Sequence, residues 1–131
     1  AEAAVEWTIA YATERKMFGQ TLADFQNTQF KMADLTAQLA AQRVFVDRCT
    51  ELHVRGALDP VDAAIAKMVT TELQFKVMDE CLQLFGGWGY MTEYPIARAF
   101  VDARLGRIGG GSVETMKSII AKTIMPGLRR K

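Results

Sequence analysis

The sequence contains very few of the residues that most often bind metals or act as catalysts. His53 is the only histidine among 131 residues, and Cys49 and Cys81 are the only cysteines. Both cysteines lie in segments with strong helical character and lack the spacing of metal ligands. We therefore expect two reduced core thiols, a histidine at a helix end where positive charge is favourable, and neither a metal site nor a hydrolase triad.

Long hydrophobic runs and an excess of one charge are also missing. No apolar run approaches the roughly 20 residues that a membrane-spanning helix needs, and the first residues lack the pattern of a signal peptide. The 16 Lys and Arg residues nearly balance the 15 Asp and Glu residues, for a net charge of +1. This balance gives no reason to expect a nucleic acid or an anionic membrane as a partner. We predict a protein without membrane insertion.

What the sequence does contain is apolar residues at helical spacing. Met32, Leu35 and Leu39, for example, recur three or four residues apart and define one helix face. Almost nothing has the alternation of a strand. Helices are expected over residues 1–17, 24–55, 59–84, 96–104 and 112–124. Long amphipathic helices with short connections predict one all-α domain over residues 1–131, an antiparallel four-helix bundle of up-and-down topology with one additional short helix.

Glycine, proline and capping residues mark the predicted helix ends. Gly19 and Gly56 are expected to stop the first two helices. Asp59-Pro60 suits the start of the third, and Ser112 suits the N-cap of the last. Residues 1–5 have the character of a helix interior and carry no capping residue, which predicts that the sequence belongs to a longer chain.

Two glycine-rich breaks are the candidate ligand sites. Residues 86–90 follow a helix, so they lack the strand–glycine–helix order of a dinucleotide fingerprint, and the pattern alone favours a structural turn. Residues 109–111 lead into the predicted helix start at Ser112, where free amides attract anions or acceptor atoms. A ligand contact and a flexible interhelical loop explain this second break equally well. The nearby carboxylates are Glu93, Asp102 and Glu114, and no two of them form a distinctive catalytic pair.

Three motifs follow one another in a fixed order. Residues 11–26 fit the pattern Y-x-x-x-R-x-x-F-G-x-x-L-x-x-x-Q, and residues 83–95 fit Q-x-x-G-G-x-G-Y-x-x-E-x-P. Residues 101–104 with 108–114 are similar to R-D-A-R followed by I-x-x-G-T-x-E. The resemblance that they carry, in order and spacing, covers essentially the whole chain. They resemble the C-terminal domain of the acyl-CoA dehydrogenases, and they are most similar to its long-chain branch.

The resemblance implies a set of site residues and partners. Residues matching those that hold the adenine and diphosphate side of FAD, bound in a neighbouring subunit, are Arg15, Phe18, Gln26, Gln83, Gly86 and Gly87. Ser112, in place of the usual threonine, and Glu114 match positions near the flavin of the same subunit, and Gly110 and Gly111 match the acyl site. The implied partners are an acyl-CoA substrate, an electron-transfer flavoprotein and further copies of the chain in a homodimer or homotetramer.

One position departs from the common pattern of this family. Many members carry the catalytic glutamate, within Y-E-G-T, where this chain has Gly110, and glycine cannot remove a proton. The long-chain and isovaleryl branches also have a small residue here, and their glutamate lies on the preceding helix. By that pattern the base lies upstream of Ala1, so we expect no catalytic residue within this sequence. The alternative is a non-catalytic helical oligomerisation domain of a dehydrogenase-like relative.

The resemblance implies α,β-dehydrogenation of acyl-CoA thioesters, with long-chain substrates the expected class. The full-length protein would carry this activity, and the isolated 131-residue chain is expected to be inactive. An acyl-CoA oxidase or a flavin monooxygenase of the same superfamily is a further alternative. The expected location is the cytoplasm of a bacterium or the mitochondrial matrix of a eukaryote.

Overall fold

The computed structural model describes residues 1–125 and 127. Within this part of the chain the main elements are helices, with the bounds α1 Glu2–Glu14, α2 Gln26–Val54, α3 Pro60–Phe85, α4 Pro95–Gly106 and α5 Val113–Ile124. Three smaller elements complete the list: an antiparallel hairpin of β1 (Lys16–Met17) and β2 (Gln20–Thr21), and the 3₁₀ helices η1 (Leu22–Asp24) and η2 (Gly86–Tyr90). No helix in the described residues is long and apolar enough to cross a membrane.

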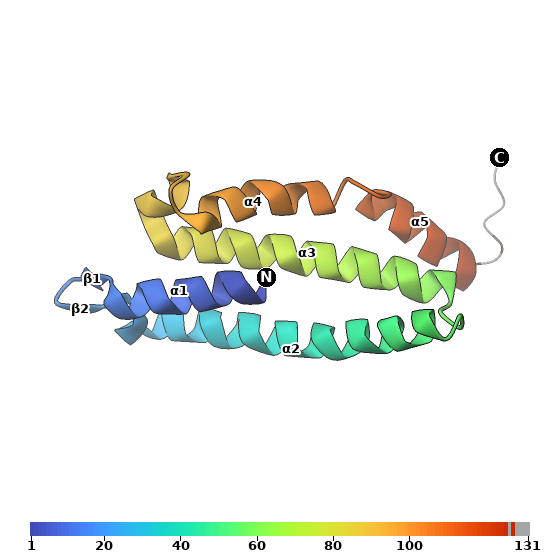
Figure 1. The fold of residues 1–131 in the computed structure, drawn as a ribbon, viewed down its shortest axis with the longest axis horizontal. Helices are drawn as coiled ribbons and strands as arrows, with labels where there is room; N and C mark the ends of the chain where they lie inside the picture. The colour runs from blue at the N-terminus through green and yellow to red at the C-terminus, as the bar shows by residue number, and fades with distance from the viewer. Residues whose placement is uncertain (126, 128–131) are drawn as a thin grey trace.

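From α1 to α4, each helix runs in the direction opposite to the one before it, as predicted (Figure 1). α3 is the central element and packs against α1, α2, α4 and α5. α1 lies beside the first half of α2, while α4 and α5 follow one another along α3 as a single interrupted row (Figure 1). The expected all-α, up-and-down bundle is therefore confirmed, and the additional short helix is part of its fourth row.

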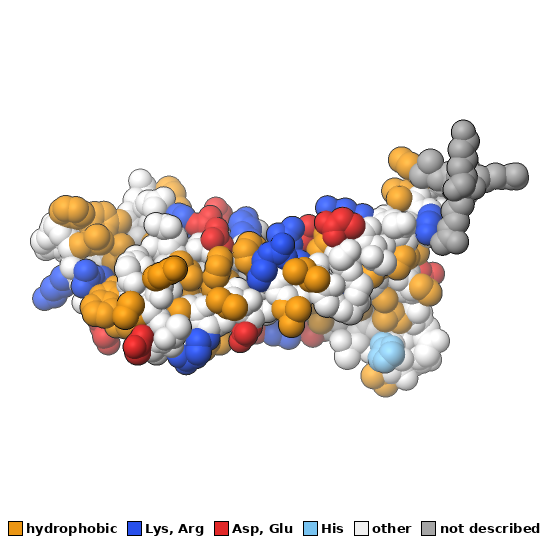
Figure 2. Space-filling model, turned by 90° about the horizontal axis from the view of Figure 1, so that it is seen from above, with side chains coloured by type: hydrophobic (Ala, Val, Ile, Leu, Met, Phe, Trp, Pro, Cys, Tyr) orange, Lys and Arg blue, Asp and Glu red, His pale blue; other side chains and the backbone are white. Residues whose placement is uncertain are grey.

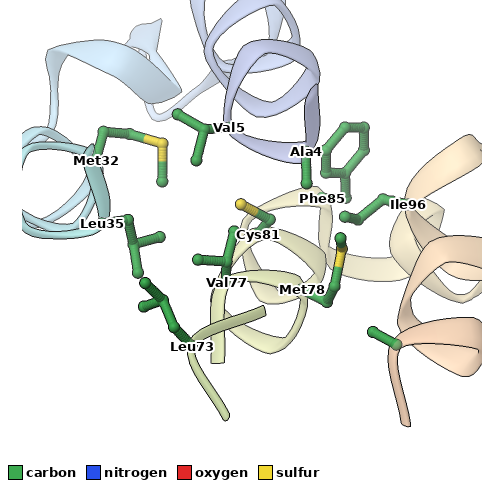
Figure 3. Packing of buried hydrophobic residues seen from close by; sticks show 11 residues of the cluster. Ala4, Val5, Met32, Leu35, Leu73, Val77, Met78, Cys81, Phe85 and Ile96 are labelled. Carbon is green, nitrogen blue, oxygen red and sulfur yellow. The ribbon is translucent and has the colours of Figure 1, made fainter. Parts of the chain in front are cut away.

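The core lies between α3 and the helices around it (Figure 3). Its buried members are Ala4, Val5, Met32, Leu35, Leu73, Val77, Met78, Cys81, Phe85, Ile96 and Ala103. Because α3 is covered on several sides, the exposed positions in its second half are confined to the stripe Lys76, Asp79 and Gln83. Removal of this apolar surface from water is the main stabilising term of such a bundle.

The predicted caps and core thiols are present. The side chain of Asp59 accepts a hydrogen bond of 2.7 Å from the amide of Val61, and Pro60 occupies the first position of α3. Ser112 accepts a hydrogen bond of 3.3 Å from the amide of Thr115 at the start of α5. Cys49 and Cys81 are buried and free, and burial raises the pKa of the Cys81 thiol, so its protonated form is favoured.

The predicted end of the first helix was wrong. α1 stops at Glu14, and the following residues form the hairpin, with Lys16 opposite Thr21. Phe18 and Gly19, at the hairpin tip, have φ angles of 51° and 84°. A two-residue hairpin turn of type I′ requires two positive φ angles, because its twist then matches that of the strands. Gly19 therefore turns a hairpin and does not stop a helix.

Candidate functional site

A cleft opens where the β1–β2 hairpin approaches the end of α3. Its volume is about 530 Å³. Its walls come from α1, the hairpin and its flanks, the end of α3 and η2, through Tyr11, Arg15, Met17, Leu22, Leu84, Phe85, Gly86, Gly87, Trp88 and Met91. Two sequence motifs that are far apart in the chain, residues 11–26 and 83–95, therefore share one cleft.

Aromatic packing holds these two motifs together. The ring of Tyr11 stacks on that of Phe85 with centroids 4.3 Å apart, and the Tyr11 hydroxyl donates a hydrogen bond of 3.3 Å to the Phe85 carbonyl. Tyr94 packs edge-on against Phe85 at 5.8 Å and lies 5.6 Å from Trp88. Such pairs stabilise a structure beyond their buried area. The amide of Arg15 bonds to the Tyr11 carbonyl at 2.9 Å, so the backbone of Arg15 is tied to the same packing.

The glycines of residues 86–90 have two different roles. Gly86 ends α3 with a φ of 59°, a conformation that favours glycine. Gly89 is buried, and a Cβ there would lie 2.5 Å from the Leu82 carbonyl oxygen. Gly86 and Gly87 have open space around the position of a Cβ, so their backbone is accessible from the cleft. The structural turn favoured by the sequence is present at Gly86, and Gly89 adds a close approach between backbones.

Six residues were expected to contact the dinucleotide at this end of the bundle, and the structure separates them into two groups. Arg15, Gly86 and Gly87 line the cleft. Phe18, Gln26 and Gln83 are exposed but do not line it. Hydrophobic side chains also gather on the surface toward the hairpin end, whereas charges of both signs are interspersed along the α4 and α5 face (Figure 2).

The remaining predicted residues lie where α4 leads into α5: Gly110, Gly111 and Ser112 on the connecting loop, and Glu114 in the first turn of α5. Gly110 and Gly111 have φ angles of 64° and 93°, so a glutamate at position 110 would adopt a strained backbone conformation. Ser112 and Glu114 border a smaller cavity of about 230 Å³ together with Arg104 and Arg107. The amide of Glu114 itself and then the Ser112 hydroxyl lower the pKa of the Glu114 carboxyl, as expected in the first turn of a helix.

The cleft and this loop are two separate places on the molecule. α4, of 12 residues, runs from one to the other (Figure 1), and 12 residues of helix are roughly 18 Å long at about 1.5 Å per residue. Residues 11–26 and 83–91 therefore contain one candidate site, and residues 110–114 contain another.

Comparison with known proteins decides which family this arrangement represents. Residues 1–125 match the family model of the acyl-CoA dehydrogenase C-terminal domain. The chain belongs to the acyl-CoA dehydrogenase family. Over 120 residues it is 49% identical to the mitochondrial long-chain specific acyl-CoA dehydrogenase of Mus musculus, a match that covers 92% of this chain and 28% of the mouse protein.

Solved structures of acyl-CoA dehydrogenases have the same fold. The enzyme of Geobacillus kaustophilus matches with a TM-score of 0.91 and 38% identity over 95% of this chain and 33% of that one. The butyryl-CoA dehydrogenase of Megasphaera elsdenii matches with a TM-score of 0.90 and 36% identity, over 95% and 32%. The chain thus spans about a third or less of the length of these relatives.

Acyl-CoA dehydrogenases depend on FAD, and the residues of the cleft fit the adenine and diphosphate part of that cofactor. Arg15 supplies a guanidinium group, which suits a phosphate. Gly86 and Gly87 leave backbone accessible to a diphosphate. The Trp88 ring, 46% exposed, offers the kind of flat apolar surface on which a purine stacks.

Trp88 and the methionines Met17 and Met91 line the cleft but were not expected as site residues. One feature of the sequence could have identified Trp88 as a site residue. Trp88 is flanked by Gly87 and Gly89, and a tryptophan between glycines has no neighbouring side chains to cover its ring. The methionines gave no comparable signal, because their pattern does not differ from that of core residues.

Phe18 combines high exposure with an unfavourable backbone conformation. Its side chain is 91% exposed, and its positive φ is rare for a large aromatic residue. We expect Phe18→Asn to raise the free energy of unfolding by about 1 kcal/mol, because asparagine tolerates this conformation. Urea denaturation of the two chains would measure the difference. A loss of stability in Phe18→Asn would contradict the expectation and show that the phenyl ring contributes packing.

Proposed function

We propose that this chain is the C-terminal domain, over residues 1–131, of an FAD-dependent enzyme that dehydrogenates acyl-CoA thioesters between the α and β carbons. The observation that carries the proposal is the cleft that Arg15, Gly86 and Gly87 line together. In this assignment the Arg15 guanidinium and the glycine backbone bind the diphosphate of FAD. Phe18, Gln26 and Gln83 contact the same cofactor from the surrounding surface. When bound, FAD accepts the hydride from the β carbon.

The second part of the proposed site lies on the loop between α4 and α5 and in the first turn of α5. Ser112 and Glu114 lie near the flavin, while Gly110 and Gly111 leave room for the acyl group. The glycine backbone in the left-handed region disfavours a glutamate at position 110 and so supports a base located elsewhere. The two places, which α4 separates, are assigned to cofactors of different subunits in a homodimer or homotetramer, as the family resemblance implies.

The identity of 49% with the mouse long-chain enzyme supports a long-chain acyl group as the preferred substrate. The proposed electron acceptor is an electron-transfer flavoprotein, with which family members interact. The proposed location is the mitochondrial matrix or the bacterial cytoplasm, because the relatives include mitochondrial and bacterial proteins. Turnover rates with butyryl-CoA and palmitoyl-CoA would show which chain length is preferred.

Substitution of Arg15 tests the proposal in the full-length protein. We expect Arg15→Gln to weaken FAD binding by about 10- to 100-fold, because a charge-assisted hydrogen bond to phosphate contributes about 1.5–3 kcal/mol. Equilibrium titration of the apoprotein with FAD measures this change. Arg55→Gln is the matched control, since Arg55 is an exposed arginine that follows α2, outside both candidate sites.

Activity provides the second half of this test. Palmitoyl-CoA should bleach the flavin of the full-length protein, whereas the isolated 131-residue chain should show no such reaction. Equal FAD affinity of the Arg15→Gln and Arg55→Gln proteins would show that the cleft is not part of the cofactor site. A full-length protein that binds FAD but is not reduced by acyl-CoA would favour the non-catalytic relative.

A further inference from the structure

Lys67, on α3, reaches across to the loop that contains the three consecutive glycines. Its ammonium group donates a hydrogen bond of 3.2 Å to the carbonyl of Gly106 and a second hydrogen bond to the carbonyl of Gly111. The side chain is half-buried. Among the ion pairs of the described residues, none joins Lys67 to a carboxylate. The charged group of Lys67 therefore interacts with backbone carbonyls.

One carbonyl precedes the three consecutive glycines, and the other belongs to the last of them. Gly106 is the last residue of α4, where carbonyls have no partner within the helix and carry partial negative charge. Gly111 directly precedes Ser112, the N-cap of α5. An ammonium group has three donors and can satisfy both carbonyls at once. Lys67 thus connects the end of one helix to the start of the next.

A loop of this composition needs such a connection. Gly110 and Gly111 adopt positive φ angles. Three consecutive glycines can also exchange among many alternative backbone conformations. Backbone hydrogen bonds at the two ends of the glycines run from the Gly109 amide to the Leu105 carbonyl at 2.8 Å and from the Val113 amide to the Arg107 carbonyl at 3.1 Å. Neither of these hydrogen bonds involves the central helix.

A second contact between α3 and the loop is weaker than the contact of Lys67. Glu72 lies 3.9 Å from Arg107, at the limit of an ion pair, and it lies equally far from Lys117. The Arg107 guanidinium also stands 5.6 Å from the centre of the Phe75 ring. These contacts position the beginning of the loop. Gly111, at its end, is held to α3 by Lys67.

We propose that Lys67 is the positioning residue of the glycine loop, which it holds in the single conformation that presents Ser112 and the first turn of α5 to the acyl and flavin site. Lys67 acts through the backbone and does not touch the reacting atoms. The inference rests on the proposed function, in which this loop borders the reaction. It adds to that function a residue of α3 that lies outside the three motifs of the family resemblance.

The test uses Lys67→Met in the full-length, FAD-loaded protein, because methionine keeps an unbranched side chain and removes the charge and the donors. Hydrogen exchange at the hydrogen-bonded amides of Gly109 and Val113 should become about 10-fold faster, a change of about 1.4 kcal/mol in local opening. Lys67→Arg should restore part of the protection. Lys76→Met is the matched control, because Lys76 is an exposed lysine of the same helix that donates to Gln38.

Steady-state kinetics with palmitoyl-CoA provides the readout that loss of stability alone would not produce. In Lys67→Met we expect kcat to fall by about 10-fold or more, with the KM for acyl-CoA and the FAD content changing far less, because misplacement affects the reacting geometry. Unchanged exchange at Gly109 and Val113, or equally faster exchange throughout the bundle, would overturn the proposal. Faster exchange at Gly109 and Val113 with an unchanged kcat would also overturn the proposal.

Failure of the proposed function is distinguishable from failure of this inference. If the wild-type protein does not oxidise acyl-CoA at all, the proposed function is wrong, and the role of Lys67 in that reaction is overturned with it. The exchange experiment still decides whether Lys67 holds the loop. If the wild type is active and Lys67→Met matches the Lys76→Met control in both measurements, the inference about Lys67 alone is wrong.

Discussion

Phe85→Ala is expected to lower the free energy of unfolding by about 3–5 kcal/mol, the usual cost of removing a buried phenylalanine. The Phe85 side chain is 4% exposed and belongs to the central core cluster. It also stacks on Tyr11 at 4.3 Å and supports Tyr94 at 5.8 Å. The substitution therefore removes a transfer free energy, creates a cavity and breaks the contact between α1 and the end of α3.

Urea denaturation of wild-type and variant chains measures this difference. Phe30→Ala is the matched control, because Phe30 of α2 is 61% exposed, and it should change stability by only about 0.5 kcal/mol. Phe85→Leu should lie between the two, since leucine refills part of the cavity. A cost near that of Phe30→Ala would mean that Phe85 does not anchor the two motifs to each other.

Gly89→Ala should be the next most damaging change, at about 2–3 kcal/mol. The added methyl group would lie 2.5 Å from the Leu82 carbonyl oxygen, 3.1 Å from the Leu82 Cγ and 3.2 Å from the Phe85 Cβ. The nearest of these atoms belongs to the backbone of α3 and cannot turn aside as a flexible side chain can. η2 would have to move away from α3, and with it one wall of the cleft.

Gly87→Ala is the control from the same short segment. A Cβ at Gly87 meets nothing within 4 Å, so the change in stability should stay within about 0.5 kcal/mol. The midpoints of urea denaturation for the two variants give the comparison directly. Equal midpoints would show that the approach of η2 to α3 relaxes without cost. In the full-length protein, by contrast, Gly87→Ala should disturb FAD binding more than stability, because the methyl group would project from backbone that lines the cleft.

Much of the candidate site follows from local patterns. The capping residues Asp59 and Ser112, the turn at Gly86 and the helix interiors depend on short-range hydrogen bonds and on backbone preferences, and these are properties of neighbouring residues. The hairpin at residues 16–21 was missed for a related reason. Its strands have two residues each, too few for an alternating pattern, and Phe18 is a residue that turn preferences do not favour.

The contact between Lys67 and the glycine loop could not be predicted in this way. Lys67 and Gly111 are 44 positions apart, and a lysine within a helix has no pattern that identifies a backbone carbonyl as its partner. The same applies to the cleft, which forms only when α1 and α3 pack with Tyr11 against Phe85. Trp88 becomes a site residue through that packing.

The sequence by itself determined the helices, their order, the family resemblance and the absence of a catalytic side chain at position 110, because each of these depends on residue identity and spacing along the chain. Only the tertiary structure decided that Arg15 and Gly86 share one cleft, that Gly89 is a packing requirement and that Lys67 joins α3 to the loop before α5. The physical reason is that these features depend on the distance between helices, which is set by side-chain packing across the core.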